Sequence, residues 1–142
     1  MPAKPNTKPA PSPAPAFVDP ATTPDIYALR VSGDCMAPAI RNGDHVLCDK
    51  CAPVEAGELA VFYYRPDRIP EGERQANLKR IVLLPSPSIS FPYHNHPDST
   101  VSPVMIVESD NPQDRYAVDC DALLGIHRCL GLVPAHVKLV AG

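Results

Sequence analysis

The sequence predicts a mainly β protein, folded as a compact, coiled antiparallel sheet or partly open barrel, with a disordered N-terminal arm. Short β-prone apolar runs separated by turn residues recur from residue 26 onward. No segment keeps a helical apolar period over about 12 residues. Eight of the 19 prolines lie within residues 1–24. A length of 142 residues supports one compact domain with an appendage.

Residues 1–24 form the predicted arm, and residues 25–142 form the predicted β domain. The arm is rich in Pro, Ala, Ser, Thr and Lys, which supply little to a core and favour extended conformers. Phe17 and Val18 are its only apolar island. We expect this island to contact nothing, with docking on the body or on a partner as the alternative.

Six strands and one short helix are expected along the rest of the chain. Turn residues at Gly33, at 42–44 and at Gly57 separate the first three runs. The expected strands cover residues 26–31, 45–48, 59–64, 78–84, 104–107 and 123–133, and the expected helix covers 36–41. The mixed-charge stretch 65–75 predicts an exposed hairpin tip; because it precedes the strand containing Lys79, shaping a substrate groove is the alternative.

Composition excludes several classes of protein. The formal net charge is −3 and the pI about 5.9, so no overall basic field attracts nucleic acid or anionic lipid. No apolar run approaches the roughly 18 residues that span a bilayer, and no signal-peptide pattern opens the chain. We therefore expect a cytoplasmic protein with no direct nucleic-acid or membrane partner. Five cysteines, an odd number, argue against a disulfide framework.

The segment 31–50, VSGDCMAPAIRNGDHVLCDK, is the most informative part of the sequence. A small polar residue after a Gly turn, followed by Met-x-Pro, predicts that Cys35 lies at an exposed corner between a strand and a turn, near free backbone N–H groups. Such a corner suits a nucleophile beside an oxyanion hole. Further along, Lys79 interrupts an otherwise apolar strand and is a candidate to be buried toward this corner.

These motifs resemble those of the self-cleaving peptidase domains of LexA, UmuD and lambda-type repressors, to which signal peptidases are distantly related. The nucleophile motif, Gly-x-Ser-Met-x-Pro followed by Gly-Asp, is matched by residues 33–38 and 43–44, with Cys35 in place of Ser. The lysine motif is matched by Lys79 and Arg80, and a Ser-Asp-Asn-Pro motif by residues 109–112, before Leu124-Gly125-Ile126. The resemblance covers roughly residues 26–134.

The resemblance implies a catalytic dyad of Cys35 and Lys79, with backbone N–H groups of Asp34 and Cys35 as oxyanion donors. It also implies a homodimer, with residues 123–137 as the first candidate surface, although the run 130–134 is open to a core role. A DNA-damage (SOS) response or prophage setting follows by the same analogy, with a recombinase filament or a polymerase as a possible protein partner.

Two departures from the family pattern bear on activity. A thiol with an ordinary pKa of about 8.5 beside an amine of about 10.4 favours a thiolate–ammonium pair, whereas burial favours thiol plus amine. In addition, residues 1–34 contain no Ala-Gly or Cys-Gly bond of the kind that relatives cleave in themselves. The short Pro-rich arm also leaves no room for a helix-turn-helix domain.

The sequence therefore favours a degenerate or non-self-cleaving member that serves as an interaction or dimerisation module. The alternative is an active peptidase that uses Cys35 and Lys79 to cleave a protein in trans. A second alternative is a metal or redox site at Cys48 and Cys51, a CxxC pair.

The alternative to a metal or redox site is a purely structural role. In that interpretation Cys48 points inward from a strand, Cys51 lies in a turn, and Cys129 fills core space. The pair of His94 and His96 predicts a solvated loop rather than a metal site, because no third ligand is evident. Asp44 is expected to close its turn through backbone hydrogen bonds. No cofactor and no metal are expected.

Overall fold

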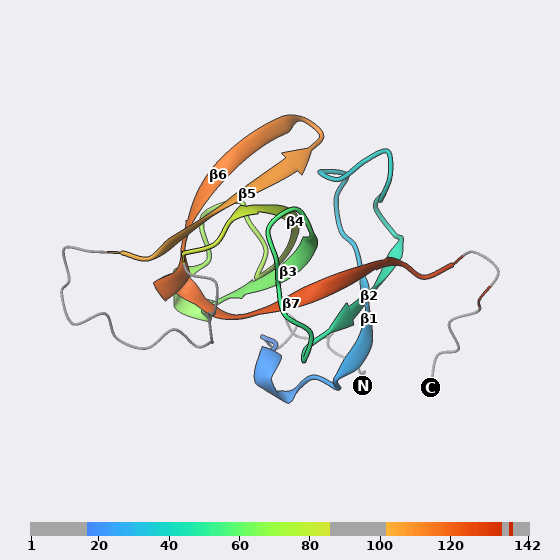
Figure 1. The fold of residues 1–142 in the computed structure, drawn as a ribbon, viewed down its shortest axis with the longest axis horizontal. Coiled ribbons are helices and arrows are strands. Elements are labelled where there is room, and N and C mark those ends of the chain that lie inside the picture. Colours follow the sequence, from blue (N-terminus) through green and yellow to red (C-terminus); the bar gives the residue numbers. More distant parts are fainter. Residues whose placement is uncertain (1–16, 86–101, 135–136, 138–142) are drawn as a thin grey trace, which may run out of the picture.

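A computed structural model describes residues 17–85, 102–134 and 137 of the chain. In these residues seven strands and three short 3-10 helices follow one another in the order shown in Figure 1. The strands are β1 (Ile26–Arg30), β2 (His45–Asp49), β3 (Leu59–Tyr64), β4 (Ala76–Leu83), β5 (Val104–Asp110), β6 (Gln113–Asp119) and β7 (Leu123–Leu132). The 3-10 helices are η1 (Pro20–Thr22), η2 (Pro66–Arg68) and η3 (Cys120–Ala122).

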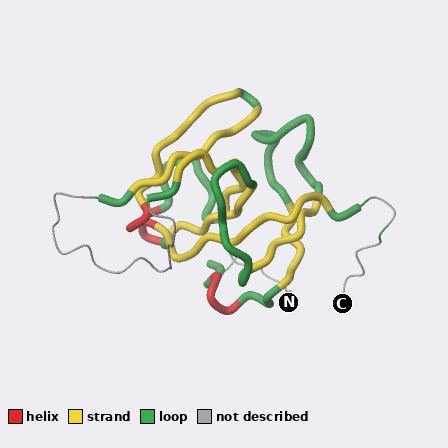
Figure 2. Tube along the Cα trace, in the orientation of Figure 1, coloured by secondary structure: helices red, strands yellow, loops and turns green. Residues whose placement is uncertain are grey.

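The strands form one antiparallel sheet in the order β1-β2-β7-β3-β4-β5-β6. The sheet is not closed, because β1 and β6 are its two edges, and it coils so that strands distant in the order surround shared cores (Figure 2). The mainly β, coiled antiparallel fold predicted from the sequence is confirmed. β7 lies between β2 and β3, so the strand latest in the chain joins the two halves of the sheet.

The central strand β3 is buried on both of its faces. Ala60, Phe62 and Tyr64 pack in one apolar cluster with residues of β4, β5 and β7, whereas Val61 and Tyr63 pack in a second cluster with residues of β1, β2 and the connection between them. This double burial explains why β3 reads as a continuous apolar run instead of an alternating pattern. The second cluster contains Met36 and Ile40, so the core directly supports the segment that contains Cys35.

Two expectations about secondary structure were wrong. The helix expected over residues 36–41 is a set of turns, because proline at 38 has no N–H and only Ile40 N donates to Met36 O in helical spacing, at 3.1 Å. The strand β6 was not expected. Its outer residues are mostly exposed along the edge of the sheet, so the sequence shows no apolar alternation there.

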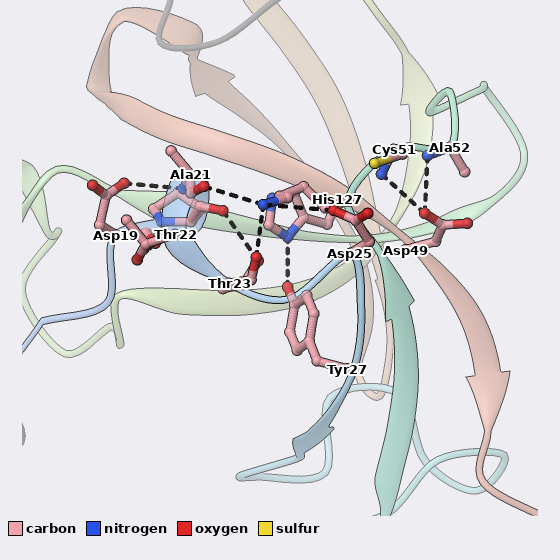
Figure 3. Close-up of polar contacts among 12 residues, drawn as sticks. Asp19, Ala21, Thr22, Thr23, Asp25, Tyr27, Asp49, Cys51, Ala52 and His127 are labelled. Carbon is pink, nitrogen blue, oxygen red and sulfur yellow. Dashed lines mark hydrogen bonds and ion pairs between the residues drawn. The ribbon is translucent and has the colours of Figure 1, made fainter.

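Residues 17–25, most of which the sequence places in the arm, pack on the sheet. Pro20 is buried against Gly125, and Val18 exchanges two hydrogen bonds with the side chain of Gln75, at 2.9 and 2.7 Å. Lys50 Nζ donates to the carbonyl oxygens of Ala21 and Thr23, at 3.1 and 2.6 Å (Figure 3). Val18 thus contacts the body, contrary to expectation, through partners that are distant in sequence.

The connection between β3 and β4, residues 65–75, is an exposed hairpin tip as predicted. His94 and His96 lie outside the described residues. Within the described ranges, no helix is long and apolar enough to cross a membrane.

Candidate active site

Cys35 lies in a tightly bonded connection between β1 and β2. Gly33 adopts φ +90°, a left-handed conformation that glycine tolerates, and its N–H donates to Asn42 Oδ1 at 2.8 Å. The Asn42 N–H in turn donates to Asp34 Oδ1 at 2.9 Å. Asp44 Oδ2 accepts from the Arg41 N–H at 2.8 Å, so Asp44 closes the turn as predicted. These bonds fix the backbone on both sides of the thiol.

The Cys35 side chain is half-buried, and its thiol faces β4. Its Sγ donates to the carbonyl oxygen of Leu78 at 3.8 Å, the residue immediately before Lys79. The structure therefore brings the nucleophile position and the lysine strand together, as the family pattern implies.

The third motif holds the nucleophile turn in place from the other side. The backbone N–H groups of Asp110 and Asn111 both donate to the carbonyl oxygen of Cys35 at 2.8 Å, and Asn111 Nδ2 donates to Asp34 O at 3.1 Å. Figure 1 shows the tip of the β5–β6 hairpin beside the β1–β2 connection. Arg80 forms an ion pair with Asp110 at 3.0 Å. The residues of all three sequence motifs thus meet at one place.

Lys79 does not bond to Cys35 in this structure. It is half-buried, and its Nζ lies 5.7 Å from the ring centroid of Tyr116 on β6. Both residues are described, and no hydrogen bond joins Sγ of Cys35 to Nζ of Lys79. The two predicted dyad residues are therefore on adjacent elements, but each has a different partner.

The backbone amides predicted as oxyanion donors, those of Asp34 and Cys35, have no hydrogen-bond acceptor within residues 17–85 and 102–134. Neither residue is buried. Unpaired N–H groups next to a thiol are the arrangement that an oxyanion site requires.

A groove of about 150 Å³ opens beside the thiol. One wall comes from the end of β1 and the nucleophile turn, and the other from the start of β4 and from Arg74, two residues before it. The lining residues are Leu29, Arg30, Val31, Ser32, Cys35, Met36, Arg74, Ala76, Asn77 and Leu78. Because Arg74 belongs to the β3–β4 hairpin tip, this loop contributes to the wall of the groove, in line with the alternative role expected for residues 65–75.

The start of β4 offers this groove a backbone edge that pairs with no described strand and whose Leu78 carbonyl oxygen accepts, among the described residues, only from the Cys35 thiol. Gln75 O and Ile81 O accept bonds on the β3 side, so alternation directs the N–H and C=O groups of Ala76 and Leu78 the other way. β5 pairs with β4 only from Arg80 onward. Among the described strands, none pairs with Ala76 or Leu78 on that side.

The CxxC pair is divided between the core and the surface. Cys48 is fully buried, and its partner across the β2–β7 ladder is Cys129, whereas Cys51 is exposed. Burial raises the pKa of the Cys48 thiol to about 12. All five cysteines are free, and the described residues contain no group of three or more His, Cys, Asp or Glu side chains suited to a metal ion. The inward, turn and core-filling positions expected for Cys48, Cys51 and Cys129 are confirmed.

Sequence reasoning missed Arg30 and Tyr116 as neighbours of the site. Arg30 is the last residue of β1. Its place beside the groove depends on the register of β1 against β2 and on the coiling of the sheet, which local sequence does not specify. Tyr116 belongs to the unexpected strand β6. The Asn-Pro turn residues at 111–112, shortly after an expected strand, were the available signal for a hairpin and hence for that strand.

Comparison with known proteins agrees with the geometry. Searches of curated proteins and of solved structures give no significant match. A family model described as Peptidase S24-like matches residues 8–88, more than half of the chain, and this range includes both Cys35 and Lys79. With three motifs converging on one thiol in a coiled β sheet, the chain belongs to the Peptidase S24-like family.

Proposed function

We propose that this protein is a non-self-cleaving member of its family that acts as an interaction module, binding an extended segment of another protein in the groove beside Cys35. One observation carries the proposal: the Cys35 thiol bonds to the carbonyl oxygen of Leu78, and the Lys79 amine lies over the Tyr116 ring instead. The groove beside the thiol supports binding of a segment, whereas the separate contacts of Cys35 and Lys79 give no support to proton transfer between them.

Lys79 has a partner other than Cys35. A cation over the face of an aromatic ring is attracted by the ring quadrupole, so the contact with Tyr116 holds the Lys79 amine at a position where it makes no hydrogen bond with the thiol. A base that takes a proton from a thiol must lie within hydrogen-bond reach of it. The contact therefore works against catalysis in this arrangement.

The open edge of β4 supports binding of an extended chain. A segment laid along Ala76 and Leu78 gains backbone hydrogen bonds from groups that no described strand uses, and at the Leu78 carbonyl oxygen it shares or replaces the bond from the Cys35 thiol. Its side chains alternate between the groove and solvent, so every second residue meets the apolar wall of Leu29, Met36 and Leu78.

The test attaches N-ethylmaleimide to Cys35, so that the added group blocks the groove. In a Cys51→Ser protein, Cys35 is the only cysteine that is not buried. The probe is an acetylated and amidated octapeptide of alternating Val and Ser with an uncharged fluorophore, and binding is followed by fluorescence anisotropy. We expect N-ethylmaleimide on Cys35 to abolish binding. A Cys35→Ser, Cys51→Ser protein treated in the same way is the matched control and retains binding. Unchanged binding after modification of Cys35 contradicts the proposed groove.

One observation favours a second candidate function, cleavage of a protein in trans. The Cys35 thiol contacts the carbonyl oxygen of Leu78, the residue next to Lys79. In that reaction Lys79 accepts the thiol proton, sulfur attacks the peptide carbonyl, and the amides of Asp34 and Cys35 hold the oxyanion. Lys79 returns the proton to the departing amine, and water hydrolyses the thioester.

The pH dependence of Cys35 alkylation by iodoacetamide distinguishes the two functions. An assembled dyad gives an apparent pKa well below about 8.5 that Lys79→Ala abolishes. The proposed interaction module gives the same profile in both proteins. Intact-mass time courses with a peptide library add a direct readout, since cleavage must then depend on both residues.

Homodimerisation belongs to the same proposal. Leu130 and Leu132, in the segment expected to mediate pairing, are 51% and 43% exposed, so the end of β7 is surface and not core. Sedimentation velocity on the native protein and on Leu130→Ser, Leu132→Ser tests this: loss of a dimer supports the surface, and a native monomer contradicts it. A stress-response or prophage setting is proposed from family membership alone.

A further inference from the structure

The geometry points to a specificity of the groove: we propose that it selects a polypeptide segment with an Asp or Glu side chain next to small apolar residues. Arg30 and Arg74 hold the carboxylate. This inference rests on the proposed binding of an extended segment beside Cys35 and names the chemistry that such a segment carries.

The charge of the groove is opposite to that of the molecule. The chain has a formal net charge of −3, yet the charged residues that line the groove are two arginines, Arg30 and Arg74, with no carboxylate among the lining residues. A cationic cleft in an acidic protein concentrates anionic ligands locally, where low-dielectric walls focus the field.

Both arginines are available to a ligand. Neither forms an ion pair with a carboxylate of the described residues, whereas Arg68, Arg80, Arg115 and Arg128 each do. Both side chains are exposed. A guanidinium presents a planar fork of donors that matches a carboxylate, so an arginine without an ion-pair partner on each wall can bind a carboxylate that enters the groove.

The backbone of each arginine is held by the fold. Arg30 is the last residue of β1 and pairs with His45 of β2, and its guanidinium lies beside Gly43, with Nη2 3.9 Å from the position that a Cβ on Gly43 would occupy. The carbonyl oxygen of Arg74 accepts from Asn77 Nδ2 at 2.7 Å, which ties the hairpin tip to β4. A ligand therefore meets two anchored residues rather than a free loop.

The remaining lining favours a polypeptide over a nucleic acid. Leu29, Val31, Met36, Ala76 and Leu78 give the groove apolar walls, and its volume of about 150 Å³ holds a few small side chains rather than stacked bases. Single-stranded nucleic acid is held by aromatic platforms, and no aromatic residue lines this groove. An acidic residue flanked by residues such as Ala or Val satisfies both the arginines and the walls.

The experiment compares Glu with Gln in a peptide that carries no other charge. The probes are acetylated, amidated octapeptides of alternating Val and Ser, labelled with an uncharged fluorophore, in which each Ser in turn is replaced by Glu or by Gln. Fluorescence anisotropy gives the Kd for native protein, Arg30→Gln, Arg74→Gln and Arg41→Gln. Arg41 is the matched control, since it is exposed, lies in the same turn region and does not line the groove.

We expect at least one Glu position to bind about tenfold more tightly than its Gln counterpart, as for a charge-assisted hydrogen bond. Arg30→Gln and Arg74→Gln remove most of this ratio without weakening the Gln peptide, and Arg41→Gln keeps it. Raising the NaCl concentration reduces the ratio as well.

The outcomes separate this inference from the proposed function. If Glu and Gln peptides bind equally and N-ethylmaleimide on Cys35 blocks both, the acidic preference is overturned and the proposed interaction module stands. Absence of binding by every peptide overturns both. A single-stranded oligonucleotide that binds more tightly than any Glu peptide, and loses affinity in the two groove variants, assigns the arginines to phosphates and overturns the inference.

Discussion

The side-chain amide of Asn111 donates a hydrogen bond to the carbonyl oxygen of Asp34 over 3.1 Å, joining residues 77 positions apart. Together with the two backbone bonds to the Cys35 carbonyl oxygen, it clamps the nucleophile turn against the β5–β6 hairpin. The rigidity of the turn therefore comes from another part of the chain.

Asn111→Ala is expected to loosen this clamp. Loss of one hydrogen bond lowers the free energy of unfolding by about 1 kcal/mol and raises the rate at which iodoacetamide modifies Cys35. Denaturant titration and mass spectrometry measure the two effects. Gln113→Ala, which truncates an exposed amide in the same hairpin, is the control and changes neither. An unchanged rate at Cys35 contradicts the restraint by Asn111.

Gly125→Ala is expected to dislodge the N-terminal segment. A Cβ at position 125 would lie 2.8 Å from Cγ of Pro20, and the Gly125 backbone itself is not left-handed, so the cost is steric. We expect a loss of about 1–3 kcal/mol in the free energy of unfolding. Adding Pro20→Ala to Gly125→Ala restores part of the loss if the contact is the cause, and additive losses contradict it.

Stability is expected to fall as the pH drops below about 6.5, because of His127. Its Nδ1 bonds to the Tyr27 hydroxyl at 2.5 Å, and Tyr27 bonds to Tyr63 at 2.6 Å. Burial, and then the charge of Lys50, lower the pKa of His127, against smaller raising effects of Asp49 and of the backbone of Pro20.

The direction follows from linkage. The unfolded chain binds a proton more readily than the folded chain, so the contribution of neutral His127 is complete above the unfolded pKa and is lost progressively toward the lowered folded pKa. Urea titrations at pH 7.5 and pH 5.5 measure it. His127→Asn, which keeps a hydrogen-bond acceptor without titrating in this range, should lose less stability between the two pH values. An equal loss in both proteins contradicts the assignment to His127.

Native alkylation is expected to divide the cysteines into two groups. Burial raises the pKa of Cys48 and of Cys120 to about 12, and raises that of Cys129, so these three thiols should resist iodoacetamide at pH 8 until the protein is unfolded. Cys35 and Cys51 should react in the native protein. Mass spectrometry of peptides, with and without urea, gives the result. Modification of Cys48 in native protein indicates that β2 separates from β7.

Much of the fold was predictable because the strands carry local signals. The continuous run at β3 and the turn residues before β2 identified those elements directly. β6 and the segment around Pro20 escaped prediction because their order depends on distant partners: β5 for the first, Gly125 and Lys50 for the second. The short stretches of sequence around β6 and Pro20 contain none of those partners, so local patterns could not predict this order.

The candidate site was predictable in its residues and not in its contacts. Cys35, Lys79 and the motif at 109–112 stand out by type and spacing, and the motif at 109–112 and the neighbours of Lys79 contact the turn that contains Cys35 or each other. The contact of Lys79 with Tyr116 and the presence of Arg30 on the groove depend on strand pairing and side-chain direction. Pairing of this kind joins residues too far apart for local patterns to specify.

The insertion of β7 between β2 and β3 has a consequence for the order of assembly. While the chain is synthesised, β2 and β3 emerge early but share no ladder, because the strand that joins them is made after β6. Until β7 is made, the groove wall from β1 and the groove wall from β4 belong to two parts of the sheet that no strand joins. A nascent chain that ends before about residue 132 should therefore lack the finished groove, because it lacks the strand that joins the two halves of the sheet.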